Sequence, residues 1–153
     1  MYKWLKVAES GGKIMLIGEF TPTIDTKGRL NFPSKLRDDL GGRFIITKGL
    51  DNCLFVYPMD EWQKLEEKIR ALPLSKARTL QRFLFASACE AQIDSQGRVL
   101  IPQNLREYAQ LTKEVTVIGA SVRAEIWNRE RWAQSGEELT SESIEEAMDE
   151  LGF

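Results

Sequence analysis

The sequence predicts a mixed α/β fold of the α+β type, in which two copies of one short unit interlock into a single domain. The first observation is an internal repeat, because residues 24–37 and 93–106 are identical at seven of fourteen positions. The second is that both copies have the same order of apolar runs, turn residues and helical spacing. The third is size. A unit of about 45 residues is at the lower limit of independent folding, so we expect two copies to share one β core about a pseudo-two-fold axis.

In each copy a short strand leads into the motif Asp-x-x-Gly-Arg and then into a second strand. The Asp side chain can accept hydrogen bonds from the backbone that follows it, and Gly can adopt positive φ, so the motif predicts a tight turn. Pro33 and Pro102 stand where a first helical residue belongs, and Gly41-Gly42 is a stop signal. The predicted strands are 20–24, 30–32, 43–47 and 54–57 in the first copy and 90–93, 99–101, 114–118 and 124–127 in the second, with turns at 48–52 and 119–121.

Helical spacing of apolar residues predicts further helices between the copies and after them. One begins near Asp60 and ends at Pro73, and Ser75 can cap the next. Near the C-terminus Ser143 and Glu146 have the spacing of a capping box. The apolar faces consist of Leu80, Phe83 and Leu84 in the second helix and of Ile144, Met148 and Leu151 in the last.

The composition excludes several classes of protein. Among 153 residues there is no histidine and there are two cysteines, which argues against His-based catalysis, His-ligated metals and a disulfide-rich scaffold. No apolar stretch has the length of a membrane span, and residues 1–14 lack the apolar run of a signal peptide. No set of residues assembles a nucleophile, a base and an oxyanion site. We therefore expect a cytoplasmic protein that is not an enzyme and has no metal, cofactor or small-molecule ligand.

The charge is unevenly distributed along the chain. The net charge is −2, but residues 137–153 contain seven acidic side chains and no basic one, which leaves 21 basic and 16 acidic residues before them. A basic body of this kind is compatible with a nucleic-acid partner, whereas the mean charge is not. The alternative reading is a solvated acidic tail on a protein without such a partner.

The candidate DNA-binding residues surround the first Asp-x-x-Gly-Arg turn. Asp25 stands four residues before Arg29 and, with Gly28 in the turn, can fix the direction of the arginine while other guanidinium donors stay free. Arginine suits both phosphate and guanine, and a β-ribbon is an element that the major groove admits. The predicted DNA-binding residues are Lys27, Arg29, Lys35, Arg37 and Arg43.

The second copy has the same turn with fewer cations. Gln96 and Asn104 stand where the first copy has lysines, so we expect the second motif to be more structural. Its members are Asp94, Gly97, Arg98 and Arg106. The alternative for both copies is that the Asp–Arg pairs are internal ion pairs that only pin the turns. Both interpretations can hold together, with Asp as the structural member.

The remaining conspicuous side chains are interpreted as core. Trp62 and Trp132 fall at matching positions of the two copies and are expected to anchor each β unit, which we favour over a base-stacking role. Cys53 and Cys89 have neither metal-ligand spacing nor a histidine partner, so they are interpreted as small apolar residues.

The doubled motif, the stretch Thr47-Lys48-Gly49-Leu50-Asp51-Asn52-Cys53-Leu54-Phe55-Val56-Tyr57-Pro58 and the triplet Glu125-Ile126-Trp127 resemble the bacterial MraZ transcriptional regulators. The resemblance covers about residues 15–132. It implies two AbrB-like swapped-hairpin modules, that is, tandem β-barrel halves about a pseudo-two-fold axis. It also implies a nucleoid-associated, ring-shaped homo-oligomer that binds double-stranded DNA at short repeated elements upstream of the division and cell-wall gene cluster. The family's Asp-x-x-x-Arg signature falls on Asp25/Arg29 and Asp94/Arg98.

The resemblance suggests a division of the chain, and the chain departs from the family pattern twice, in the extension before Met15 and in the pair Asn31-Phe32. The expected parts are an N-terminal extension at 1–14, a first module at 19–61, a helical connection at 62–89, a second module at 90–133 and an acidic helical segment at 134–153. Asn31 and Phe32 replace the plainer apolar pair Leu100-Ile101 of the second copy, which leaves the argument on Arg29 intact.

Two other functions remain open at the level of the sequence. One is an antitoxin-like DNA-binding module whose acidic C-terminal segment binds a basic protein toxin. The other is a structural ring or interaction protein with no nucleic-acid role. Binding of a partner through residues 137–153 distinguishes the first, and the absence of salt-dependent DNA binding distinguishes the second.

Overall fold

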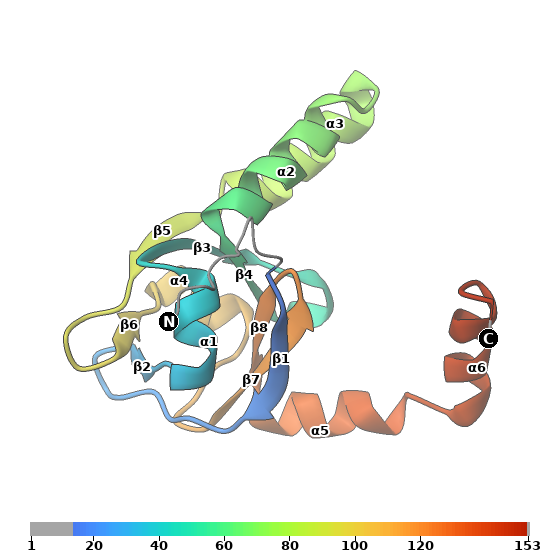
Figure 1. Ribbon diagram of the computed structural model, residues 1–153. Helices are drawn as coiled ribbons and strands as arrows, with labels where there is room; N and C mark the ends of the chain where they lie inside the picture. The colour runs from blue at the N-terminus through green and yellow to red at the C-terminus, as the bar shows by residue number, and fades with distance from the viewer. Residues whose placement is uncertain (1–13, 153) are drawn as a thin grey trace, which may run out of the picture.

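The computed structural model describes residues 14–152, so the expected extension at 1–14 lies outside the described residues except for its last one. The fold alternates strands with short helices, as predicted (Figure 1). The strands are β1 (Leu16–Phe20), β2 (Arg29–Asn31), β3 (Arg43–Lys48), β4 (Leu54–Pro58), β5 (Cys89–Gln92), β6 (Arg98–Leu100), β7 (Val115–Ser121) and β8 (Ala124–Asn128). The helices are α1 (Ser34–Leu40), α2 (Met59–Arg70), α3 (Leu74–Leu80), α4 (Gln103–Tyr108), α5 (Arg129–Glu137) and α6 (Ser141–Asp149), with a 3₁₀ turn at Leu50–Asn52 and a π-helical segment at Gln81–Phe85.

The strand order shows how the two copies interlock. Six antiparallel strands form one sheet in the order β1-β7-β8-β4-β3-β5, and β2 pairs with β6 in a separate two-stranded ribbon. β1 of the first copy pairs with β7 of the second, and β5 of the second copy pairs with β3 of the first. Counted inward from either edge, corresponding strands of the two copies therefore follow in the same order, and β4 and β8 pair at the centre of the sheet. The interlocked halves that the repeat predicts are confirmed.

The main core lies between the sheet, the ribbon and the two short helices α1 and α4. Both helices turn an apolar face toward this core. Leu36 and Leu40 of α1 are buried in it, and so is Leu105 of α4. Leu30 and Val99 face this core from the ribbon and are 0% and 1% exposed. One side of the ribbon is thus fixed by burial, and alternation leaves the other side to solvent.

A second, aromatic core covers the opposite face of the sheet, toward α2 and α3. β4 is buried on both faces because Leu54 and Val56 belong to the first core and Phe55 and Tyr57 to the second. The rings of Trp62 and Tyr57 lie 5.7 Å apart between centroids, and those of Trp132 and Trp127 lie 5.3 Å apart. Both Trp62 and Trp132 pack against this second cluster, which confirms the prediction that they anchor the two β units.

The two cysteines have the predicted apolar role. Cys53 is 1% exposed within the aromatic core, and Cys89 is half-buried against the main core. Burial raises the pKa of both thiols, most strongly for Cys53. A thiol with a raised pKa is a poor nucleophile and a poor metal ligand.

Some predicted boundaries are wrong, and tertiary pairing explains the largest errors. The first strand lies at Leu16–Phe20 and not at 20–24, where only the isolated bridges of Thr23 and Ile24 occur. β7 continues through the predicted turn at 119–121, because β1 pairs with it up to Ser121. The strands of residues 14–152 also form two separate sheets and not one closed barrel, because the β2–β6 ribbon is not part of the six-stranded sheet.

The helix starts also differ in detail from the prediction. Pro33 and Pro102 occupy the N-cap positions, one residue before α1 and α4 begin. Pro73, and not Ser75, is the N-cap of α3. The capping box of α6 is formed by Thr140 with Ser143, three residues before the predicted pair. Within the described part of the chain, no helix is both long and apolar enough to cross a membrane.

Candidate nucleic-acid interface

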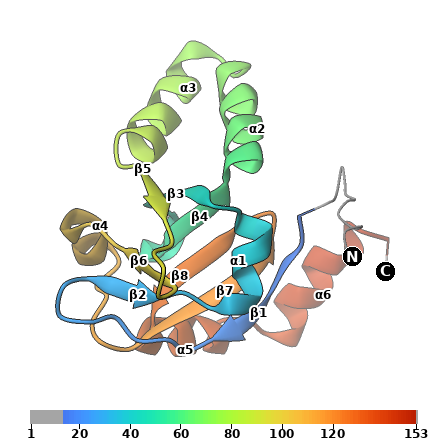
Figure 2. The same ribbon diagram turned by 60° about the vertical axis from the view of Figure 1, so that its left-hand side comes forward.

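The solvent side of the β2–β6 ribbon gathers polar side chains from both copies. In the antiparallel register Arg29 lies opposite Leu100, Leu30 opposite Val99, and Asn31 opposite Arg98. Because Leu30 and Val99 point into the core, alternation places the other four side chains on the outer face. Arg29 and Arg98 are diagonal neighbours on that face. The ribbon lies at the lower left of Figure 2, away from the tip of the α2–α3 hairpin.

Asp25 fixes the direction of Arg29 in the way the sequence predicts. Its Oδ1 accepts hydrogen bonds from the backbone N–H groups of Lys27 and Arg29, both at 2.9 Å. Its Oδ2 accepts from Nε of Arg29 at 2.8 Å. Among residues 14–152 only Nε of this guanidinium has a protein partner, so the two terminal nitrogens remain available on the outer face.

Asp94 and Arg98 repeat this geometry in the second copy. Oδ1 of Asp94 accepts from the backbone of Gln96 and Arg98 at 2.9 Å each, and Oδ2 accepts from Nε of Arg98 at 3.1 Å. The side chains of Arg29 and Arg98 are 33% and 30% exposed. The geometry does not distinguish the two pairs, so it gives no reason to treat the second as more structural than the first.

The turn hydrogen bonds also lower the pKa of both carboxyl groups. The backbone N–H of Arg29 is the largest cause that lowers the pKa of Asp25 below its ordinary value, and that of Arg98 does the same for the pKa of Asp94. Both carboxylates are therefore charged at neutral pH and hold their arginines by charge as well as by hydrogen bonds.

Arg37 and Arg106 brace the turns. Nε and Nη2 of Arg37 donate to the carbonyl of Phe32 at 3.1 and 2.7 Å, and Nη2 also reaches the carbonyl of Gly97 at 3.4 Å. Nε of Arg106 donates to the carbonyl of Ile101 at 2.9 Å. Each arginine thus ties the end of its own ribbon strand and lies against the turn glycine of the other copy.

Gly28 and Gly97 make this close approach possible. Their φ angles are +84° and +80°, in the left-handed region that favours glycine. A Cβ at position 28 would lie 2.7 Å from Cζ of Arg106, and one at position 97 would lie 2.3 Å from Nη2 of Arg37. The backbone conformation therefore requires glycine, and a side chain at either position would also displace the arginine guanidinium that packs there.

The three other predicted cations lie in different surroundings. Lys27 is exposed in the first turn, and Lys35 is exposed on α1, where it lines a shallow hollow together with Asn31. Nη1 of Arg43 is engaged in an exposed ion pair with Glu90 at 2.8 Å.

Sequence reasoning missed two side chains of the outer face. From the sequence alone Asn31 stands out only as a departure from the second copy and Leu100 only as its counterpart there, although Leu100 is 58% exposed. The signal that locates them is the strand alternation around Leu30 and Val99. That signal becomes usable only when one knows that these two strands pair with each other.

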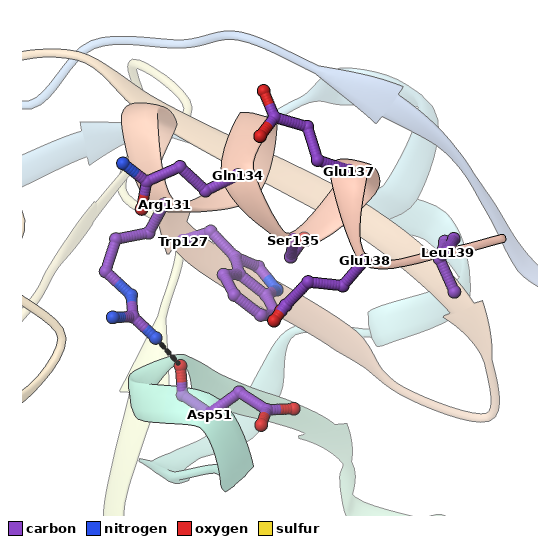
Figure 3. A pocket seen from close by; sticks show the side chains of 8 residues that line it. All are labelled: Asp51, Trp127, Arg131, Gln134, Ser135, Glu137, Glu138 and Leu139. Atoms are coloured by element: carbon purple, nitrogen blue, oxygen red, sulfur yellow. Dashed lines mark hydrogen bonds between the residues drawn. The ribbon is translucent and has the colours of Figure 1, made fainter.

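A second hollow lies away from the ribbon, between the 3₁₀ turn and α5 (Figure 3). Arg131 reaches across it, and its Nη2 donates to the backbone carbonyl of Asp51 at 3.1 Å. The carboxylates of Asp51, Glu137 and Glu138 also line it. Three carboxylates repel phosphate, so this hollow is not part of the candidate DNA interface.

Comparisons with known proteins identify the family of this chain. A family model described as "MraZ protein, putative antitoxin-like" matches the chain twice, over residues 15–83 and 84–151. A protein of Caldicellulosiruptor saccharolyticus is 56% identical over 143 residues, which cover 91% of this chain and 100% of the relative. One of Alkaliphilus metalliredigens is 53% identical with the same coverage. Both are named "Transcriptional regulator MraZ", which is not the name of an enzyme. The resemblance seen in the doubled motif is confirmed, and the chain belongs to the MraZ family.

Proposed function

We propose that this chain is a sequence-specific DNA-binding transcriptional regulator that reads the major groove with the outer face of the β2–β6 ribbon. The observation that carries the proposal is the pair of carboxylate-directed arginines, Arg29 and Arg98, which stand on one exposed face although they come from different copies. The names of the relatives support a regulator of transcription.

The side chains of this face suit base edges. Terminal guanidinium nitrogens can donate two hydrogen bonds to guanine, and the Asn31 amide can pair in the same way with adenine. Leu100 offers an apolar contact of the kind that the thymine methyl group accepts. A two-stranded β-ribbon is narrow enough to enter the groove with these side chains in front.

The surrounding cations are assigned to phosphate contact and to positioning. Lys27 in the first turn and Lys35 on α1 are exposed, and they would contact the DNA backbone without reading sequence. Arg43 would have to leave Glu90 to do the same. Arg37 and Arg106 act on the ribbon indirectly, because their guanidinium groups bind backbone carbonyls.

The finer part of the proposal follows the family resemblance. The chain would act as a ring-shaped homo-oligomer on short repeated elements upstream of the division and cell-wall gene cluster, and so be found in the cytoplasm at the nucleoid. One ribbon with few cations binds weakly at physiological salt, whereas several ribbons on repeated elements gain affinity through effective concentration. The antitoxin-like alternative uses the same ribbon and differs in what the C-terminal helix binds.

The test is DNA binding by Arg29→Ala and Arg98→Ala variants, measured by fluorescence anisotropy on the upstream DNA and on a scrambled duplex. We expect each variant to weaken specific binding about 5- to 150-fold per ribbon, the equivalent of about 1–3 kcal/mol for a lost bidentate base contact. Arg70→Ala is the matched control, since Arg70 is an exposed arginine on α2 whose partner among residues 14–152 is Glu66.

The structural reading of the Asp–Arg pairs predicts a different result. If the arginines only pin the turns, both variants lose thermal stability and the folded fraction keeps its preference for the native sequence. If the wild-type protein does not discriminate native from scrambled DNA at any salt concentration, the ribbon is not a reader of sequence.

A further inference from the structure

The last helix exposes an apolar face that no residue between 14 and 152 covers. Ile144, Met148 and Leu151 follow one another at the spacing of a single helical face and are 44%, 39% and 74% exposed. The capping box of Thr140 and Ser143 fixes the start of α6, so this face is presented by an ordered helix. α6 stands apart from the sheet at the far end of α5 (Figures 1 and 2).

The polar surroundings of this face are acidic. Glu142, Glu145, Glu146 and Asp149 belong to α6, and no lysine or arginine follows residue 131 in the sequence. The surface that covers this face therefore has to be apolar in its centre and basic at its rim.

The α2–α3 hairpin offers such a surface. A groove at its tip is lined by Leu72, Ser75, Lys76, Thr79 and Leu80, and Leu72 is 37% exposed there. Lys76 is the charged residue that lines this groove, and no carboxylate lines it. Arg78 and Arg82 add positive charge elsewhere on this helical segment, and residues 74–82 contain no acidic residue. Leu74 adds an apolar side chain that is 76% exposed.

The two surfaces lie too far apart to meet within one chain. In both views the tip of the α2–α3 hairpin is at the top of the molecule and α6 is at the lower right (Figures 1 and 2). They also occupy corresponding places in the repeat, since α2 and α3 follow β4 as α5 and α6 follow β8. α3 folds back beside α2, whereas α6 does not fold back on α5.

We propose that α6 of one copy docks in the α2–α3 groove of a second copy of this chain. The contact joins two different surfaces, so it repeats head to tail and closes into a ring when the rotation per copy allows it. The inference rests on the homo-oligomer of the proposed function and names its interface. It also assigns the acidic C-terminal segment to self-assembly and not to a toxin.

The first experiment measures the mass of the full chain by light scattering during size-exclusion chromatography. One variant, Ile144→Asp with Met148→Asp, changes the α6 face, and another, Lys76→Glu with Thr79→Glu, changes the groove. All four positions are exposed, so circular dichroism should show an unchanged fold. We expect each variant to run as a single chain. Glu146→Ala, on the opposite side of α6, is the matched control and should assemble as the wild type does.

Mixing the two variants tests the direction of the contact. The groove variant retains an intact α6 and the α6 variant retains an intact groove, so the mixture should give a one-to-one complex and nothing larger. Wild-type protein that is a single chain overturns the proposal, as does full assembly by either variant or a mixture without the one-to-one complex.

DNA binding by the same variants separates this inference from the proposed function. The single-chain variants should keep the wild-type affinity for one isolated repeat and lose about 100-fold or more on tandem repeats, because the gain from linked sites is lost. If the wild type assembles but shows no specific DNA binding, the proposed function fails while the masses still test the interface.

Discussion

Asp25 and Asp94 determine where the exposed arginines point, and this part of the site could be predicted from the sequence. The pairing joins residues four apart across one tight turn, so it depends only on local geometry. The placement of Arg29, Asn31 and Arg98 on the same face of the ribbon could not be predicted in this way. It depends on the pairing of β2 with β6, which brings together residues from opposite halves of the chain.

Acid titration should report the two turns directly. The pKa of each carboxyl is lowered in the folded state from an ordinary value of 3.8, so the stabilisation that it provides is complete above that value. It is lost as the pH falls through the lower folded-state pKa. Carboxyl carbon shifts of Asp25 and Asp94, followed by NMR between pH 6 and the onset of acid unfolding, should give midpoints below 3.8.

The matching control is Asp25→Asn, which keeps an acceptor oxygen but removes the charge. In this variant the Arg29 Nε resonance should lose its protection against exchange while that of Arg98 keeps it. Midpoints at or above the ordinary value would mean that the turn hydrogen bonds do not hold the carboxylates in solution.

Replacement of Gly28 should disturb both copies, because this turn glycine belongs to the first copy and packs against Arg106 of the second. Gly28→Ala forces positive φ on an alanine and pushes its Cβ against the Arg106 guanidinium. We expect the free energy of unfolding to fall by about 1–2 kcal/mol from the backbone alone. Urea titration measures the change. Gly136→Ala is the control, because Gly136 lies within α5 with no atom near its Cβ position, and it should leave stability unchanged or slightly raised. Equal effects of the two substitutions would contradict the strained turn.

At the scale of elements, β1 is held to the sheet by a close backbone approach. Gly18 and Gly119 lie opposite each other in the β1–β7 pair, and a Cβ at position 119 would lie 2.3 Å from the backbone nitrogen of Ile17. No side chain can move aside to relieve this contact, since the clashing atoms belong to the backbone. The strand therefore has to separate when the glycine is replaced.

The variant Gly119→Ala should release β1 and leave the rest of the sheet in place. Hydrogen exchange should accelerate for the β1 amides while those of β3 and β4 keep their protection, and stability should fall by about 1–3 kcal/mol. Gly42→Ala serves as the control, because no atom lies within 4 Å of its Cβ position. Unchanged protection of β1 in Gly119→Ala would show that the two strands are less tightly apposed.

The elements themselves were largely predictable where their signals are local. α1 ends before Gly41 as predicted, and β3, β4, β5 and β8 begin within one residue of their predicted starts. β1 and β7 were misplaced for one shared reason. Their pairing joins segments about 100 residues apart, and no local pattern indicates that the chain returns there.

At the scale of the whole molecule, neither half has a complete sheet of its own. β1 needs β7, and β3 takes its outer partner β5 from the other half. A fragment of residues 15–88 should therefore not fold as a monomer. It should gain structure only when two fragments combine, each supplying the strand that the other lacks.

Circular dichroism and sedimentation of this fragment over a hundredfold range of concentration test the expectation. Folding should increase with concentration, and the folded species should contain two fragments. The full chain, in which both halves are linked, is the comparison and should keep its secondary structure at every concentration. A folded fragment monomer at the lowest concentration would show that the exchange of strands is not needed for stability.

Because both halves belong to one polypeptide, mutations can change the two ends of the ribbon independently. In a pair of identical chains, one codon change alters both ends of a shared ribbon. Here a change alters one end, and the sequence already differs at matching positions, with Lys27 against Gln96 and Lys35 against Asn104. A reading surface with unlike ends has a polarity. It can therefore tell a stretch of DNA from the same stretch turned around, which a strictly symmetric reader cannot do.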